Sequence, residues 1–217
     1  MAKMPPDPSP SVATIVVILA VTDRRLQVLL VHRTGPPEEG KWALPGGRWD
    51  GSESLDALAS RKLVEETGVT DVYLEQLFTI SGLDPTRPSV AVAYFALVEA
   101  LKVRLREEEA WHPAWQPVDA LPPLAFDNNR VIEQAAARVG AKLDYTNIAY
   151  GLLPEQFTLR ELQAVYEAIL RRPLDRRNFR KRMLSAGIIT ATAERRRAGA
   201  HRPAQLFRFV SREPVIL

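Results

Sequence analysis

The chain has 217 residues, 46% of them hydrophobic and 25% charged, which suits a globular protein of one medium or two small domains. The absence of cysteine excludes disulfides, thiolate metal sites and thiol catalysis. The net charge of +3 conceals a division, because residues 1–150 carry 15 basic and 20 acidic side chains whereas residues 151–217 carry 14 and 6. The C-terminal part, with a net charge of +8, therefore favours an anionic partner.

The N-terminal region gives no sign of a membrane protein. Residues 12–21 are nearly all apolar, but ten residues are too few to span a bilayer. The first six residues do not resemble a secretory leader. We therefore expect a cytoplasmic protein without a membrane partner.

Residues 11–141 show the mixture of strand and helix patterns that is typical of an α/β domain. Two β-rich runs flank the polar pair Asp23-Arg24, which predicts a hairpin. Two further runs are expected as strands, and an apolar stripe predicts a closing helix. The expected strands are 11–22, 25–33, 72–81 and 89–100, and the expected closing helix is 127–141, with Val131, Ile132, Ala135 and Val139 facing inward.

A glycine turn and a charged helix follow the hairpin. Gly47 is separated by five residues from Glu53, and seven more residues lead to the run Arg61-Lys62-Leu63-Val64-Glu65-Glu66-Thr67-Gly68-Val69. Ser52 is expected to cap the helix and Gly68 to end it. The expected apolar stripe is Leu55, Leu58, Ala59, Leu63 and Val64.

The residue at position 62 determines whether this helix can bind a metal ion. Positions 62, 65 and 66 share one helix face because they lie three and four residues apart. Three glutamates there would bind magnesium, which prefers clustered oxygen ligands. Lys62 is not a metal ligand at neutral pH and is expected to pair with Glu65 or Glu66, so a carboxylate ligand or general base is lost.

The segment after residue 148 has the outline of a winged helix-turn-helix. Thr158 and Glu161 form a predicted capping box that opens a first helix. Asp175 is expected to cap a second helix that ends near Ser185. Two strand candidates follow, 188–192 and 205–210, joined by a predicted loop over 193–204. We place the domain boundary between residues 148 and 149.

The second helix is the expected reader of a DNA groove. Phe179 and Met183 anchor it in the core, while basic side chains occupy its remaining positions. Arginine and asparagine bond guanine and adenine bidentately, and arginines of a wing hold phosphates or enter the minor groove. The predicted DNA-binding residues are Arg176, Arg177, Asn178, Arg180 and Lys181 on the helix, and Arg195, Arg196, Arg197 and Arg202 in the wing.

The run from Gly47 to Val69 resembles the Nudix box, in which a glutamate occupies the position of Lys62. The preceding turn, Trp42-Ala43-Leu44-Pro45-Gly46-Gly47, strengthens this resemblance. Nudix enzymes use the box to hold magnesium while they cleave nucleoside diphosphate compounds. The resemblance implies an α/β/α sandwich with a mixed sheet over residues 1–148, followed by the winged helix-turn-helix over 149–217.

A Nudix-like domain before a winged helix resembles the Nudix-related transcriptional regulators of NAD metabolism. The resemblance includes the runs from Phe157 to Gln163, Arg177 to Arg180 and Arg202 to Ala204. It implies a homodimer that binds a palindromic operator of double-stranded DNA and represses NAD-related or sugar-related genes. It also implies that the Nudix part senses ADP-ribose or a related nucleotide sugar and has no catalytic residues of its own.

The same resemblance implies where the effector and a remnant metal site would lie. The residues implied for the effector are Arg48, Arg61, Glu65, Glu66 and Arg87. Those implied for weak or absent Mg²⁺ binding are Glu53, Glu65 and Glu66. Arg87 belongs to Asp84-Pro85-Thr86-Arg87, a variant of the Asp-Pro-Arg-Gly loop of ADP-ribose binders.

Two other functions stay open from the sequence. An active magnesium-dependent Nudix hydrolase of the ADP-ribose pyrophosphatase type would need a relocated general base, for which Glu107, Glu108 and Glu109 are the candidates. An RNA-binding Nudix protein is the third possibility, and a preference for structured RNA over duplex DNA would identify it.

Overall fold

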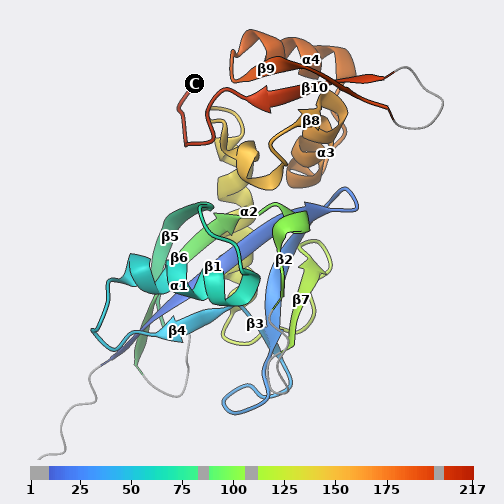
Figure 1. The fold of residues 1–217 in the computed structure, drawn as a ribbon. Coiled ribbons are helices and arrows are strands. Elements are labelled where there is room, and N and C mark those ends of the chain that lie inside the picture. The colour runs from blue at the N-terminus through green and yellow to red at the C-terminus, as the bar shows by residue number, and fades with distance from the viewer. Residues whose placement is uncertain (1–9, 83–87, 106–111, 198–202) are drawn as a thin grey trace, which may run out of the picture.

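The computed structural model describes residues 10–82, 88–105, 112–197 and 203–217 (Figure 1). A larger part built on a sheet lies below a smaller helical part with a wing of strands. No helix in the described ranges is both long and apolar enough to cross a membrane.

The larger part is built on a seven-stranded mixed sheet. Its strand order is β3-β2-β1-β6-β5, with β4 paired to β1 and β7 paired to β2. β1 and β6 run parallel, and the other neighbours are antiparallel. The strands are β1 (Ser11–Thr22), β2 (Arg25–His32), β3 (Trp42–Ala43), β4 (Gly46–Arg48), β5 (Tyr73–Ser81), β6 (Ser89–Leu97) and β7 (His112–Pro117).

The predicted hairpin between β1 and β2 is confirmed. Thr22 pairs with Arg25, so Asp23 and Arg24 form the two-residue turn. Both turn residues have positive φ, 49° and 60°, as a type I′ turn requires. This turn follows the natural twist of the strands and fixes the hairpin tip in one direction.

Two helices cover opposite faces of the sheet (Figure 1). Val16, Ile18 and Ala20 of β1 pack in one core cluster with residues of α1 (Leu55–Thr67). The alternate β1 residues, Val17 and Leu19, pack in the other cluster with α2 (Asn128–Lys142). The predicted inner residues of α2 are all 0% exposed, and the predicted α/β/α sandwich is confirmed.

The box helix α1 differs from its prediction at two places. Ser54, not Ser52, caps it, because the Ser52 hydroxyl donates to Asp50 while the Ser54 hydroxyl accepts the amide of Ala57 at 3.1 Å. Val64 is 37% exposed, and Glu66 takes the buried position at 2%. The predicted end at Gly68 is confirmed by its left-handed φ of 65°.

The smaller part is a winged helix-turn-helix. Its sheet has the order β8-β10-β9, and both bonds of the predicted capping box between Thr158 and Glu161 are present. The predicted loop after residue 192 is shorter than expected, because β9 continues to Arg196 and pairs with Ala204. The elements are β8 (Phe157–Thr158), α3 (Leu159–Leu170), α4 (Arg176–Ser185), β9 (Ile189–Arg196) and β10 (Ala204–Phe209).

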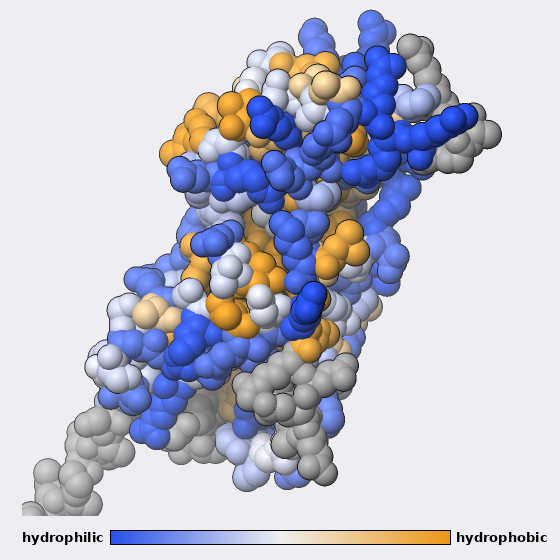
Figure 2. Space-filling model, viewed as in Figure 1, coloured by the Kyte–Doolittle hydropathy of each residue, from blue (hydrophilic) through white to orange (hydrophobic). Residues whose placement is uncertain are grey.

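The two parts share one hydrophobic core. Tyr150 lies in the short helix η2 (Ile148–Leu152). The centre of its ring is 6.4 Å from the ring centre of Tyr73 of β5 and 6.3 Å from that of Phe209 of β10. Another short helix, η1 (Ala100–Lys102), follows β6. Figure 2 shows apolar side chains through the middle of the molecule and hydrophilic ones gathered around the wing strands. The core cluster that contains Val17 also contains Phe157, so apolar packing continues across the junction.

Candidate functional site

The charged side chains of the box neutralise one another. Arg61 contacts Glu53 at 2.5 Å and Glu65 at 2.7 Å. The ammonium of Lys62 lies 2.6 Å from the second carboxylate oxygen of Glu65. Both oxygens of Glu65 are therefore bound by cations of the same helix, and the pairing predicted for Lys62 is made with Glu65.

This arrangement does not fit a magnesium ion. The hydrogen bond from Lys62, followed by that from Arg61, lowers the pKa of Glu65, so its carboxylate is ionised but occupied. Glu66 is buried in the helix–sheet interface at 2% exposure. Among the described residues, no group of three or more histidine, aspartate or glutamate side chains could hold a metal ion.

Two glycines allow the box to approach the sheet closely. A Cβ atom on Gly46 would lie 2.4 Å from the backbone oxygen of Thr14, a contact that no side chain permits. On Gly47 it would lie 2.8 Å from Cε of Lys62, so the methylenes of the lysine fill the space above this glycine. The box and the surface next to β4 therefore meet at Gly47.

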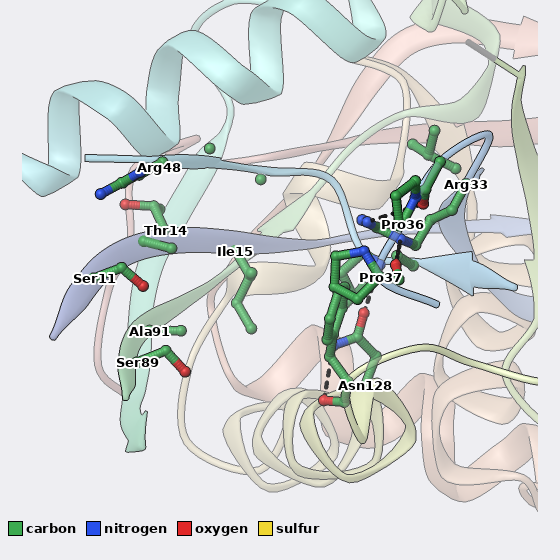
Figure 3. Close-up of a pocket in the computed structure, with 18 of the residues that line it drawn as sticks. Ser11, Thr14, Ile15, Arg33, Pro36, Pro37, Arg48, Ser89, Ala91 and Asn128 are labelled. Atoms are coloured by element: carbon green, nitrogen blue, oxygen red, sulfur yellow. Dashed lines mark hydrogen bonds between the residues drawn. The ribbon is translucent and has the colours of Figure 1, made fainter. Parts of the chain in front are cut away.

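A cavity of about 500 Å³ opens on the other side of this turn. Its size is within the usual range of small-molecule sites. In Figure 3, Arg48, Thr14 and Ser11 lie on one side of it, and Arg33, Pro37 and Asn128 lie on the other. The lining residues include Ser11, Ala13, Thr14, Ile15, Val31, His32, Arg33, Pro36, Pro37, Leu44, Gly46, Gly47, Arg48, Ser89, Ala91, Phe126 and Asn128.

Arg33 and Asn128 build one wall of the cavity. Arg33 donates from Nε to the carbonyl of Pro37 at 2.9 Å, and its guanidinium lies 4.7 Å from the centre of the Phe126 ring. Asn128 accepts the amide of Leu44 at 2.8 Å. These contacts hold the segment after β2 against the start of α2. The sequence analysis missed both residues, which only the folded chain brings together.

The other wall offers polar groups that could meet a ligand. Arg48 is exposed on β4 and lines the cavity. The hydroxyl of Thr14 is buried and has no hydrogen-bond partner in the described part of the chain. Such a hydroxyl is costly to leave unpaired, so it suits a site that a polar ligand or water completes.

The structure separates the residues predicted for the effector. Arg48 lines the cavity, whereas Arg61, Glu65 and Glu66 do not, and neither does Glu53, which was predicted for the metal alone. Arg87 and the candidate bases Glu107, Glu108 and Glu109 lie outside the described residues. Of the predicted effector residues that the structure describes, Arg48 is therefore the one at the cavity.

The basic residues predicted on the second helix lie on the surface of α4. Phe179 and Met183 are buried at 6% and 1%, as predicted, and fix which face of α4 is outward. No ion pair binds the outward cations within the described ranges. The exposed cations are Arg176, Arg177, Arg180 and Lys181, and the neutral Asn178 is exposed beside them.

Two other basic side chains are engaged within the molecule. Arg182 of α4 contacts Asp144 at 3.1 Å. Arg196 of the wing contacts Glu161 of the capping box at 2.6 Å. Arg195 and Arg197 are exposed, and Arg202 lies outside the described residues. Of the predicted wing cations that the structure describes, Arg195 and Arg197 are therefore more available to a ligand than Arg196.

Comparisons with known proteins agree with both halves of this description. Residues 12–135 match the NUDIX domain, and residues 149–209 match the NrtR DNA-binding winged helix domain. The chain is 40% identical over 208 residues to the ADPR responsive transcriptional repressor NtrR of Acinetobacter baylyi, covering 93% of this chain and 83% of the relative. The chain belongs to the NrtR family.

Solved structures of another NrtR support the assignment. Shewanella oneidensis NrtR complexed with a 27mer DNA has a TM-score of 0.81 and 36% identity, covering 91% of this chain and 93% of that one. The NUDIX domain of the same protein complexed with ADP ribose has a TM-score of 0.53 and 36% identity, covering 61% and 93%. This chain and the Shewanella NrtR thus share the complete two-part architecture.

Replacement of Lys62 by glutamate should create a magnesium site in this protein. The variant frees one oxygen of Glu65 from Lys62 and adds a third carboxylate to the box, so Mg²⁺ at about ten times its dissociation constant should stabilise it by roughly 1.4 kcal/mol. That corresponds to a rise in Tm of about 3–6 °C in a thermal shift measurement. The wild type and Lys62→Met, which loses the cation without gaining a carboxylate, should not respond. An equal rise in Lys62→Met would contradict the role assigned to the third carboxylate.

Proposed function

We propose that this protein is a transcriptional repressor that binds DNA through its winged helix and releases it in response to ADP-ribose. The observation that carries the proposal is the outward face of α4, where exposed arginine and asparagine side chains have no ion-pair partner among the described residues and lie beside a buried anchor. Such a face suits the edges of bases in a major groove. The Acinetobacter relative is described as an ADPR responsive repressor, which supports the same assignment.

The cavity beside the box is the proposed effector site. Arg48 supplies a cation for a pyrophosphate, and the apolar lining formed by Ile15, Val31 and Phe126 suits the base of a nucleotide. The Shewanella Nudix domain was crystallised with ADP ribose, which supports this ligand class. Arg61, Glu65 and Glu66 do not line this cavity, and Arg61 and Glu65 are proposed to stabilise the box helix through their ion pair.

The chain is proposed to sense the nucleotide without cleaving it. Lys62 replaces a box carboxylate and binds another, so the metal-dependent chemistry of the Nudix enzymes lacks its ligands. We further propose that residues 1–148 form the sensor and residues 149–217 the DNA-binding domain. A cytoplasmic homodimer on a palindromic operator of NAD-related genes would complete the regulator, because a two-fold protein reads two half-sites.

A ligand titration tests the proposed sensor. We expect ADP-ribose at about one hundred times its dissociation constant to stabilise the protein by roughly 2.7 kcal/mol, or about 5–11 °C in Tm, with or without Mg²⁺. The Arg48→Ala variant should need more ligand for the same shift. No AMP should form during the measurement, which chromatography of the same samples would check.

The results of this titration distinguish a protein that senses ADP-ribose from an enzyme that cleaves it. Release of AMP that depends on Mg²⁺ would revive the hydrolase alternative. A thermal shift that appears only with Mg²⁺ would contradict the proposed metal-independent site. An unchanged response in Arg48→Ala, with a normal response in the wild type, would place the effector elsewhere than the cavity.

A further inference from the structure

A groove lined by four arginines lies where the β1–β2 hairpin meets the winged helix. Its volume is about 520 Å³, and its walls come from the hairpin turn, α3 and α4. Three of the arginines belong to the winged helix, and the fourth, Arg24, belongs to the Nudix part. The four side chains are Arg24, Arg160, Arg176 and Arg180.

The groove carries an excess of positive charge. Among the described residues, Glu167 is the carboxylate that lines it, and it accepts hydrogen bonds from Leu174 N at 3.0 Å, Gln163 at 2.9 Å and Arg24 at 3.2 Å. The bond from Leu174, followed by that from Gln163, lowers the pKa of Glu167, so the carboxylate is ionised at neutral pH. Four guanidinium groups and one carboxylate leave an excess of three positive charges.

The three arginines of the winged helix have no ion-pair partner within the described ranges. Arg176 and Arg180 are one turn apart and line the side of α4 that faces α3, whereas Arg177 is absent from the lining. Arg160 lies in the first turn of α3, whose N-terminus favours anions. Residues that flank the base-reading face of such a helix meet the phosphates along the groove wall.

We propose that this groove binds a phosphate of the DNA backbone and that Arg24 extends the DNA interface onto the Nudix part. The proposal rests on the DNA-binding function proposed above. The Arg24 side chain is 70% exposed, so it can leave Glu167 for a phosphate at little desolvation cost. The type I′ turn that carries Arg24 holds it at the groove. The Nudix part thereby takes a direct part in holding DNA.

Salt dependence measures this contact, because each phosphate contact adds about 0.9 to the slope of log affinity against log salt concentration. Full-length wild type and Arg24→Gln are compared on a mixed-sequence duplex of 27 nucleotides per strand, the length crystallised with the Shewanella relative. We expect Arg24→Gln to lower the slope by about 0.9 and the affinity about fivefold at roughly 0.15 M salt. An unchanged slope overturns the proposal.

Two variants separate a phosphate contact from other roles of Arg24. Arg25→Gln removes the same charge from the next position, but Arg25 contacts Asp119 at 2.6 Å and does not line the groove, so the slope should stay unchanged. Glu167→Gln removes the partner of Arg24 and should preserve or raise the affinity. If Arg25→Gln lowers the slope equally, the loss of one positive charge from the protein explains the effect without a contact in the groove. If Glu167→Gln reproduces the loss, Arg24 acts through the fold, and either result overturns the proposal.

Arg177→Ala distinguishes failure of this proposal from failure of the proposed function. Arg177 lies on α4 outside the groove lining. If Arg177→Ala weakens binding and Arg24→Gln does not, the groove proposal is wrong and the DNA-binding function stands. If neither variant changes binding, the proposed DNA-binding function is wrong as well.

Discussion

Replacement of Arg177 by alanine is expected to weaken binding to a sequence-selected DNA duplex by about tenfold to a hundredfold. A bidentate contact between arginine and guanine contributes roughly 1–3 kcal/mol of discrimination. Arg177 is exposed on α4 and has no ion-pair partner in the described part of the chain. The affinity is measured on duplexes that the wild type has selected from a random library, and the loss should be smaller on unselected duplex, where only phosphate contact remains.

Arg182→Ala is the matched control for this measurement. It removes the same charge from the same helix, but Arg182 is already bound within the molecule, because it contacts Asp144 and donates to the carbonyl of Leu143 at 3.2 Å. Its affinity for selected DNA should stay within about twofold of the wild type. A loss as large as that of Arg177→Ala would contradict the orientation of α4 described above. If Arg177→Ala lowered the affinity for selected and unselected DNA equally, Arg177 would not contribute to sequence recognition.

The second large effect is expected from Phe157→Ala. The Phe157 ring is fully buried and lies 5.0 Å from Phe209, so its removal should cost roughly 3–5 kcal/mol. Tm should fall by about 6–20 °C. All four tryptophans lie within residues 1–148, so their fluorescence reports the Nudix part alone. Because the core is continuous across the junction, we expect the tryptophan signal and the helical circular dichroism to shift together.

Phe78→Ala is a suitable comparison. Phe78 of β5 is only half-buried and packs against the edge of the same core, so a smaller fall in Tm is expected. If Phe157→Ala lowered the helical signal while the tryptophan transition stayed in place, the two parts would unfold independently. That outcome would contradict a shared core.

Local chemistry made much of the fold predictable. Asp23 and Arg24 separate two β-rich runs, and the pair forms the turn that this pattern indicates. The capping box at Thr158 depends on residues three positions apart, so the sequence alone contains it. The choice of Ser54 over Ser52 depended on competition, because Asp50 captures the earlier hydroxyl. Single hydrogen bonds of this kind determine where a helix begins, and a residue pattern does not show which of two candidate caps will form its bond.

The cavity and the arginine groove could not be predicted, because their residues are distant in the chain. Arg33 meets Phe126 across the sheet, and Arg24 meets Glu167 across 143 positions. The box motif also drew attention to Arg61, whose partners proved to be its own neighbours Glu53 and Glu65. A motif predicts which helix forms, whereas the site depends on which side of that helix faces the open space.

The length and the pairing of β2 make this strand rigid. Its eight residues span about 26 Å and pair with β1, β3 and β7 over that length, so it resists bending. Arg24 precedes one end, and Arg33, beside the cavity, follows the other. The paired strand therefore fixes the distance between Arg33 at the cavity and Arg24 at the arginine groove.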